Sequence, residues 1–328
     1  MIRTSIIIPT YNRGKMLCDT ISHLAESLPA DAEIIVVDQS DDVYPGLMEI
    51  MKNHRFRLRY YKIFIKGLPH ARNYGLDRAL GEIVIFCDDD VIPGNGFIEN
   101  HLRNYYDKEI GGVGGRILLT GKDGLINQPS TCRRFPASET GGRENGDGKS
   151  YQNVTIGRVR RWDAHLTDNF DATALGYIDH AQGCNMSFRK EAIMKAGKFD
   201  ERFGGSAHLE ETDVCLRVRK AGYRLVFDPE ATLVHLKDNK GGCRAENYQQ
   251  WFYWYGHNGM LFFLKNFNHR ILPVFIASQF LHLILSACKR RNPLIVFWGV
   301  CGYWKGLKTY KAGVRPLLGV QPQCYCRP

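Results

Sequence analysis

The sequence predicts an α/β fold, with a doubly wound, mostly parallel sheet flanked by helices. Short β-branched apolar runs alternate with helix-like segments through the first quarter of the chain. Polar residues follow three of these runs, at Thr10, Asp38 and Asp88. The 328 residues are also enough to bury a full core, in one large domain or two smaller ones.

The strand and helix signals alternate in order. Strands are expected where the runs are short, apolar and β-branched: Ser5–Pro9, Glu33–Asp38, Arg57–Phe64 and Glu82–Cys87. Helical patterns lie between them, at Arg13–Ser27, Tyr44–Lys52 and Pro69–Leu80. This order predicts right-handed crossovers and parallel strands whose carboxyl ends line one crevice.

The second half of the chain begins with a different composition. Residues 120–155 are rich in Gly, Asn, Ser and charge, which is typical of a long functional loop. A helix is expected at Glu210–Ala221, and from about Arg244 the chain reads as helices. Further strands are expected near Val154–Trp162 and at Asn185–Arg189, Arg224–Asp228 and Ala231–His235. The pattern divides the chain into residues 1–243 and a helical extension, 244–328.

The basic excess is confined to the last quarter of the chain. Lys and Arg total 44, Asp and Glu total 34, and the last acid is Glu246. Residues 247–328 hold ten basic residues, and Ile271–Cys288 is an uncharged, largely apolar stretch of 18 residues. Three interpretations stay open: association of residues 265–328 with an anionic membrane surface, a membrane span, or helices packed on the domain.

Nucleic acid is not expected as a partner, because these basic residues are sparse among apolar ones and form no reading motif. The chain enters an apolar strand directly after Met1-Ile2-Arg3, without a signal-like segment. We therefore expect a cytoplasmic location, peripheral on the cytoplasmic face of a membrane.

Three aspartates, Asp88, Asp89 and Asp90, end the fourth predicted strand. Side chains alternate along an extended chain, so Asp88 and Asp90 share a face. Close carboxylates repel unless a cation lies between them. A divalent metal with a phosphate ligand suits this position, and a solvated acidic turn is the structural alternative.

Several motifs, taken in order, resemble the family 2 glycosyltransferases of the GT-A fold over roughly residues 1–240. They are Pro9-Thr10-Tyr11-Asn12, Val36-Val37-Asp38, Ala71-Arg72-Asn73, Asp88-Asp89-Asp90 and Glu210-Glu211-Thr212-Asp213. The resemblance implies an inverting enzyme that transfers a sugar from a UDP-, dTDP- or GDP-sugar. The acceptor would be a hydroxyl of a glycan, a lipid-linked sugar or a polysaccharide precursor. Residues 1–119 would bind the nucleotide and residues 120–243 the acceptor.

The resemblance also implies a nucleotide and metal site. Asp90 and His235 would hold Mn²⁺ or Mg²⁺, with Asp88 near the ribose. Arg72 would pair with the phosphates, or form a surface ion pair instead. Asp38 would accept hydrogen bonds from the base or act only as a turn residue. The segment Pro9-Thr10-Tyr11 would frame that base.

The acceptor hydroxyl must lose a proton as it attacks, and a carboxylate of the Glu210-Glu211 pair would take it. Glu211, which replaces the family's Asp, is the preferred base, although acids also cap helix starts. Asn185 and Asp213 would lie near the donor sugar or the acceptor. Two alternative functions remain: a sugar-1-phosphate nucleotidyltransferase and a catalytically silent, nucleotide-binding membrane tether.

Overall fold

The four N-terminal strands pair in parallel, in the order β3-β2-β1-β4, as the sequence predicts. The computed structural model describes residues 3–52, 56–120, 155–236, 241–242, 245 and 247–313. The strands are β1 (Thr4–Thr10), β2 (Ala32–Asp38), β3 (Leu58–Lys62) and β4 (Ile83–Cys87). The intervening helices are α1 (Gly14–Glu26), α2 (Pro45–Lys52) and α3 (Leu68–Arg78). Every residue of β1, β2 and β4 is buried, which explains their continuous apolar runs.

Beyond β4 the sheet continues as β10-β6-β11-β5, with β9 paired to β11. Strand β10 (Asn185–Arg189) is antiparallel to both β4 and β6 (Ile110–Leu119). The two strands expected at Arg224–Asp228 and Ala231–His235 are one strand, β11 (Arg224–His235), with a register shift between Asp228 and Thr232. That prediction of two strands was wrong because a local irregularity looks like a turn in sequence.

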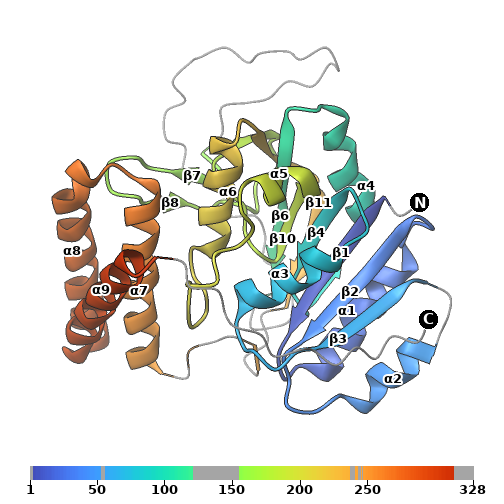
Figure 1. The fold of residues 1–328 in the computed structure, drawn as a ribbon, viewed down its shortest axis with the longest axis horizontal. Helices are drawn as coiled ribbons and strands as arrows, with labels where there is room; N and C mark the ends of the chain where they lie inside the picture. Colours follow the sequence, from blue (N-terminus) through green and yellow to red (C-terminus); the bar gives the residue numbers. More distant parts are fainter. Residues whose placement is uncertain are drawn as a thin grey trace.

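Smaller elements complete the domain (Figure 1). Of the strand expected near Val154–Trp162, the described residues form only β7 (Arg158–Val159), and most of the expected loop 120–155 lies outside them. The other elements are β5 (Val91–Pro93), β8 (Leu166–Thr167), β9 (Gly176–Ile178), α4 (Phe97–Leu102), α5 (Lys190–Lys195), α6 (Glu210–Lys220) and a 3₁₀ turn at Arg103–Tyr106.

A buried histidine links three parts of the sheet. The ring of His101 on α4 contacts Asn185 Oδ1 and Ser187 Oγ, both at 2.9 Å. The amide nitrogen of Asn185 donates to the carbonyls of Arg116 and Ala231, at 2.9 Å each. Burial lowers the pKa of His101 to about 4, so the ring is neutral at physiological pH.

The C-terminal extension forms three helices beside the sheet domain, as predicted (Figure 1). They are α7 (Tyr248–Asn266), α8 (Leu272–Arg290), which follows a 3₁₀ turn at His269–Ile271, and α9 (Leu294–Lys311). Glycines bring α7 and α9 into close contact: a Cβ at Gly302 would lie 2.0 Å from the Tyr253 carbonyl oxygen. We call α7, α8 and α9 the helical unit.

Candidate active site

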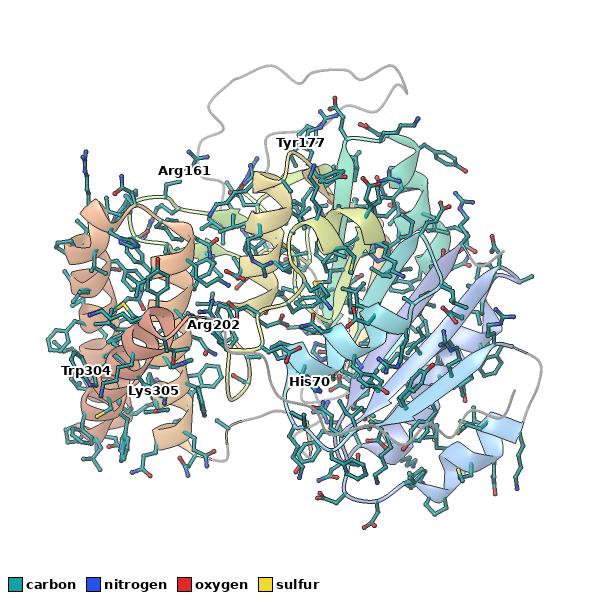
Figure 2. The ribbon with its side chains drawn as sticks, in the orientation of Figure 1. His70, Arg161, Tyr177, Arg202, Trp304 and Lys305 are labelled. Carbon is teal, nitrogen blue, oxygen red and sulfur yellow. The ribbon has the colours of Figure 1, made fainter. Side chains whose placement is uncertain are left out.

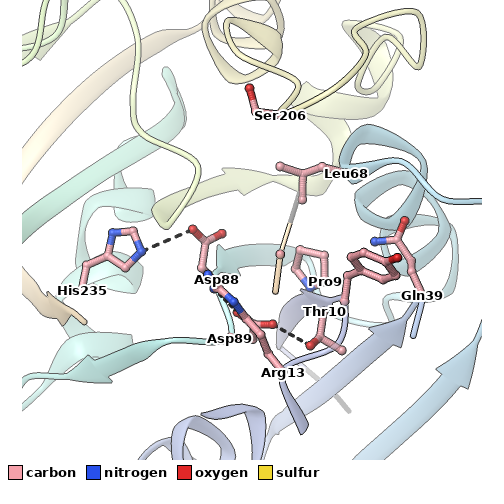
Figure 3. Close-up of a pocket in the computed structure, with 11 residues that line it drawn as sticks. Pro9, Thr10, Arg13, Gln39, Leu68, Asp88, Asp89, Ser206 and His235 are labelled. Atoms are coloured by element: carbon pink, nitrogen blue, oxygen red, sulfur yellow. Dashed lines mark hydrogen bonds and ion pairs between the residues drawn. The ribbon is translucent and has the colours of Figure 1, made fainter. Parts of the chain in front are cut away.

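The carboxyl ends of β1, β2 and β4 meet at one edge of the sheet because these strands are parallel neighbours. A cavity of about 210 Å³ opens there, with Asp88 and His235 in its wall (Figure 3). Pro9, Thr10 and Tyr11 also line it. The structure therefore brings together five of the residues that the sequence assigned to nucleotide or metal.

Asp88, Asp90 and His235 converge from opposite halves of the domain. Their ligand atoms lie within 4.8 Å of one another. His235 Nε2 is 3.0 Å from Asp90 Oδ1 and 3.8 Å from Asp88 Oδ2. Burial alone would lower the pKa of His235, but its contacts with Asp90, Cys184 and Asp88 raise it to about 11. Two carboxylates and an imidazole form a donor set suited to a divalent transition metal such as Mn²⁺.

Asp89 points away from this cluster and holds the loop in place. Its carboxylate accepts hydrogen bonds from Thr10 Oγ1 at 2.6 Å and from Arg13 at 2.9 Å. Arg13 also bonds Asp90 Oδ2 at 2.9 Å. Arg13 begins the turn into α1 and is buried, so it places one cation behind two aspartates. Arg13 is a member of this site that was not predicted from the sequence, although its place just after Pro9-Thr10-Tyr11-Asn12 was an available signal.

Arg72 lies beneath the cavity, not in its wall. Only 2% of its side chain is exposed, and it forms an ion pair with the fully buried Glu210. Its second nitrogen donates to the Gly183 carbonyl at 3.1 Å and lies 3.6 Å from Asp88. The prediction of a surface ion pair for Arg72 is therefore wrong. The arginine lies inside the protein, where it connects Asp88 to Glu210 at the start of α6.

Glu211, next in sequence, has different surroundings. It is half-buried, whereas Glu210 is buried. Burial raises the pKa of Glu211, and the nearby Arg72 and His180 act in the opposite direction. The short loop before α6 holds Gly205, Ala207 and Leu209 at positive φ, of 62°, 54° and 75°. Such strain in non-glycine residues is concentrated at functional sites.

Asp38 borders a second cavity, of about 430 Å³, which shares Thr10 with the first. Its carboxylate accepts hydrogen bonds from the Ser40 amide at 2.7 Å and from the Tyr60 hydroxyl at 2.8 Å. A carboxylate has further lone pairs for a third donor. Lys66, which was also not predicted, contacts one wall residue of each cavity: its ammonium donates to the Tyr11 hydroxyl and to Asp41, each at 3.0 Å.

Two predicted sugar contacts have structural roles instead. Asn185 is fully buried, and its amide is occupied within the sheet, as described above. Asp213 is also fully buried, where it pairs with Arg217 and Lys265, each at 2.8 Å. The structure therefore corrects both assignments: Asn185 ties strands together, and Asp213 ties α6 to α7.

Comparison with known proteins agrees with this arrangement. The family model described as glycosyl transferase family 2 matches residues 5–195, more than half of the chain. The chain belongs to glycosyl transferase family 2. The resemblance drawn from the sequence motifs is thus confirmed.

Several curated family 2 relatives share modest identity with the chain. The pre-mycofactocin glycosyltransferase of Mycobacterium tuberculosis is 24% identical over 240 residues, which cover 70% of this chain and 42% of that protein. Chondroitin synthase of Escherichia coli is 28% identical over 210 residues, or 61% of this chain and 30% of its own length. The chain therefore spans less than half the length of these relatives.

Solved structures share the fold at lower identity. The mannosyltransferase PcManGT from Pyrobaculum calidifontis, in complex with GDP-Man and Mn²⁺, has a TM-score of 0.55 at 18% identity. That match covers 96% of this chain and 76% of the other. GalNAc-T7 with UDP, GalNAc and Mn²⁺ has a TM-score of 0.56 at 16% identity, covering 78% and 48%. These matches confirm the predicted GT-A-type fold, with its mostly parallel sheet and C-terminal helices.

Proposed function

We propose that this protein is a metal-assisted, inverting glycosyltransferase that moves a sugar from a UDP-, dTDP- or GDP-sugar to an acceptor hydroxyl. The observation that carries the proposal is the convergence of Asp88, Asp90 and His235 at the edge of the cavity, where Asp88 and His235 line the wall and Asp90 lies buried behind them. Family membership and the Mn²⁺ and nucleotide ligands named for PcManGT and GalNAc-T7 support it.

In this proposal the donor extends across both cavities. Asp38 accepts a hydrogen bond from the nucleobase, and Pro9, Thr10 and Tyr11 border the nucleoside. Asp88 faces the ribose and diphosphate. A divalent metal held by Asp90 and His235 would offset the charge that develops on the departing diphosphate.

Glu211 is the proposed base for the acceptor hydroxyl. It stands in the first turn of α6, where the helix dipole favours the ionised carboxylate. Burial raises the pKa of Glu211 towards physiological pH, and this makes its carboxylate a stronger proton acceptor. Glu210 positions it, since the ion pair of Glu210 with Arg72 fixes the start of the helix beside Asp88.

We also propose that the enzyme works at the cytoplasmic face of a membrane on a glycan or lipid-linked acceptor. One helical segment, His269–Arg290, is long and apolar enough to cross a membrane, with a mean hydropathy of 1.9. A shorter match supports the acceptor class: a Campylobacter jejuni protein named GalNAc(5)-diNAcBac-PP-undecaprenol beta-1,3-glucosyltransferase is 36% identical over 94 residues, 27% of this chain and 30% of its own length.

A donor panel tests the proposal. The purified protein is incubated with UDP-, dTDP- and GDP-sugars in the presence of Mn²⁺, Mg²⁺ or EDTA, and nucleoside diphosphate release is measured. We expect metal-dependent release from a subset of donors, lost in Asp90→Ala and retained in the surface control Asp77→Ala. Nucleotide binding without release by the wild type would indicate a silent tether. Pyrophosphate release from a nucleoside triphosphate and a sugar 1-phosphate would indicate a nucleotidyltransferase.

A further inference from the structure

Helix α8 is apolar on its outward side as well as on the side that packs against its neighbours. The inward side buries Phe275, Leu283 and Ala287 and also holds two polar groups: Gln279 accepts a hydrogen bond from the Tyr255 hydroxyl of α7 at 2.9 Å, and Ser286 is buried. The outward side is apolar, and its large side chains are Val274, Ile276, Phe280, Leu281, Ile284 and Leu285. Leu285 is 60% exposed and Leu281 is 56% exposed. Surface helices of soluble domains normally place charged and polar residues outward.

Helix α9 extends this face and adds a boundary to it. Its exposed large apolar side chains recur at helical spacing: Leu294, Phe297, Val300 and Trp304. Lys308 and Lys311 continue the same stripe, and the Lys308 ammonium lies 5.1 Å from the Trp304 ring centre. Trp304 projects from the outer side of the helical unit in Figure 2. At the end of an apolar stripe that lies at a membrane surface, long lysine side chains can reach the headgroups, and tryptophan is favoured at the same level.

The charges around this face are all positive. Arg270 precedes α8, and Lys305 lies in the last turns of α9 beside the two exposed lysines. Helix α8 ends with Lys289 and Arg290, and Arg291 follows it. No Asp or Glu follows Glu246 in the sequence. Basic residues at both ends of α8 and at the end of α9 therefore complement an anionic surface, whereas a neutral or basic partner would leave them unpaired.

The structure argues against a membrane-spanning orientation of α8. Helix α7 is fixed to the sheet domain, because Asn258 exchanges hydrogen bonds with the Gly204 backbone at 3.0–3.1 Å. Lys265 of the same helix pairs with Asp213. Helix α9 contacts α7 through its glycines, and its apolar part, Leu294–Trp304, is roughly 16 Å long at 1.5 Å per residue. If α8 crossed a membrane, α9 would have to cross back to reach α7, and its apolar part is too short for a hydrocarbon core of about 30 Å.

We propose that α8 and α9 lie in the plane of an anionic bilayer, with their apolar outer faces among the acyl chains and the flanking basic residues at the phosphates. We call this outer side the docking face. The inference deepens the membrane association proposed above by naming the surface and its orientation. It rests on the helical unit and does not depend on catalysis.

Vesicle flotation tests the docking face with the full-length protein. The probes are phosphatidylcholine vesicles with and without phosphatidylglycerol. We expect binding chiefly to the anionic vesicles. Leu285→Glu with Phe297→Glu abolishes binding to both, because it places charge among the acyl chains. Lys308→Glu with Lys311→Glu lowers binding to anionic vesicles by more than about tenfold.

The matched control is Leu80→Glu, because Leu80 is 57% exposed but lies on the sheet domain. It should bind like the wild type, and donor hydrolysis should be unchanged in every variant, so that failure of docking is separate from failure of catalysis. Equal binding by Leu285→Glu/Phe297→Glu and the wild type would overturn the proposal. The proposal would also be overturned if the wild type bound no vesicles and instead formed a dimer that the Leu285→Glu/Phe297→Glu variant converts to a monomer. Wild-type protein that stays on vesicles through a carbonate wash would overturn the in-plane orientation.

Discussion

Glu210 and Glu211 are adjacent in sequence and have the same chemistry, yet they meet different environments. The side chain of Glu210 is buried against Arg72, whereas that of Glu211 is partly exposed near His180. A single step along the helix, about 100° of rotation, thus separates a carboxylate that is held as an ion-pair partner from one that is only partly buried. The two roles can be told apart by experiment.

We predict that Glu211→Gln lowers kcat by about a hundredfold to ten-thousandfold with little loss of stability, because it removes a proton acceptor. Glu210→Gln should instead lower the free energy of unfolding by roughly 3–5 kcal/mol, because it leaves the buried Arg72 without its carboxylate. Steady-state kinetics and urea denaturation of both variants provide the measurement. If Glu211→Gln retains the wild-type kcat, Glu211 is not the base.

The aspartate loop shows how far single residues can be predicted from sequence. Alternation along a strand predicts that Asp88 and Asp90 share a face, and their carboxylates do lie together with His235, whereas Asp89 accepts a hydrogen bond from Thr10. The contact of Arg13 with Asp89 and Asp90 depends on how α1 packs against the segment that follows β4, which no spacing rule predicts. The sugar contacts predicted for Asn185 and Asp213 failed for the same reason, since burial decides their partners.

At the scale of elements, the glycines of α9 determine how closely it approaches α7. We predict that Gly302→Ala lowers the free energy of unfolding by about 1–3 kcal/mol, because the new methyl group overlaps the Tyr253 carbonyl. Gly259→Ala on α7 is the control, because its added Cβ would meet only Phe275, at 4.0 Å. Thermal unfolding should show a lower Tm for Gly302→Ala and an unchanged Tm for Gly259→Ala.

The His101 cluster predicts a pH dependence of stability. The folded-state pKa of about 4 lies below the unfolded value of about 6.5, so protons bind preferentially to the unfolded chain. Stability from this group is therefore complete above pH 6.5 and is lost as the pH falls towards 4, by up to about 3 kcal/mol. Urea denaturation between pH 7 and pH 4 measures it. His101→Gln should flatten the dependence, and His23→Gln on α1 should not.

Element order was more predictable than element pairing. The first four strands and their helices follow from apolar runs and breakers, and their parallel pairing follows from the crossovers. The central position of β10 and its antiparallel direction depend on contacts with β4 and β6 that lie far away in sequence. Local pattern also divided β11 at Asp228, although pairing with β6 makes it a single strand.

For the whole molecule, metal binding should be measurable as stability. A ligand that binds only the folded state adds about 2.7 kcal/mol at one hundred times its Kd. We predict that Mn²⁺ raises the Tm of the wild type and of Asp77→Ala, but not that of Asp90→Ala. Thermal unfolding with Mn²⁺ or EDTA tests this without any donor, so it separates metal binding from turnover.

Composition alone left three arrangements open for the last quarter of the chain. The sequence shows where the basic and apolar residues are, but not which of them face α7. Only the structure shows that α8 keeps an apolar outward side, with Leu281 and Leu285 exposed, in addition to the apolar residues it buries against its neighbours. The division into two domains at residue 243 stays a prediction.

The position of β10 has a consequence for the order in which the protein can fold. Strands β1 to β4 complete their mutual pairing within the first 87 residues. Strand β6 cannot join them until β10, which ends at Arg189, has arrived to lie between. During synthesis on a ribosome, β4 therefore waits with an unpaired edge while about a hundred further residues emerge, and such non-local pairing is slow. The polar and charged side chains that follow β4 stand beside that edge, and charge is one of the features that discourage an exposed strand from joining another chain.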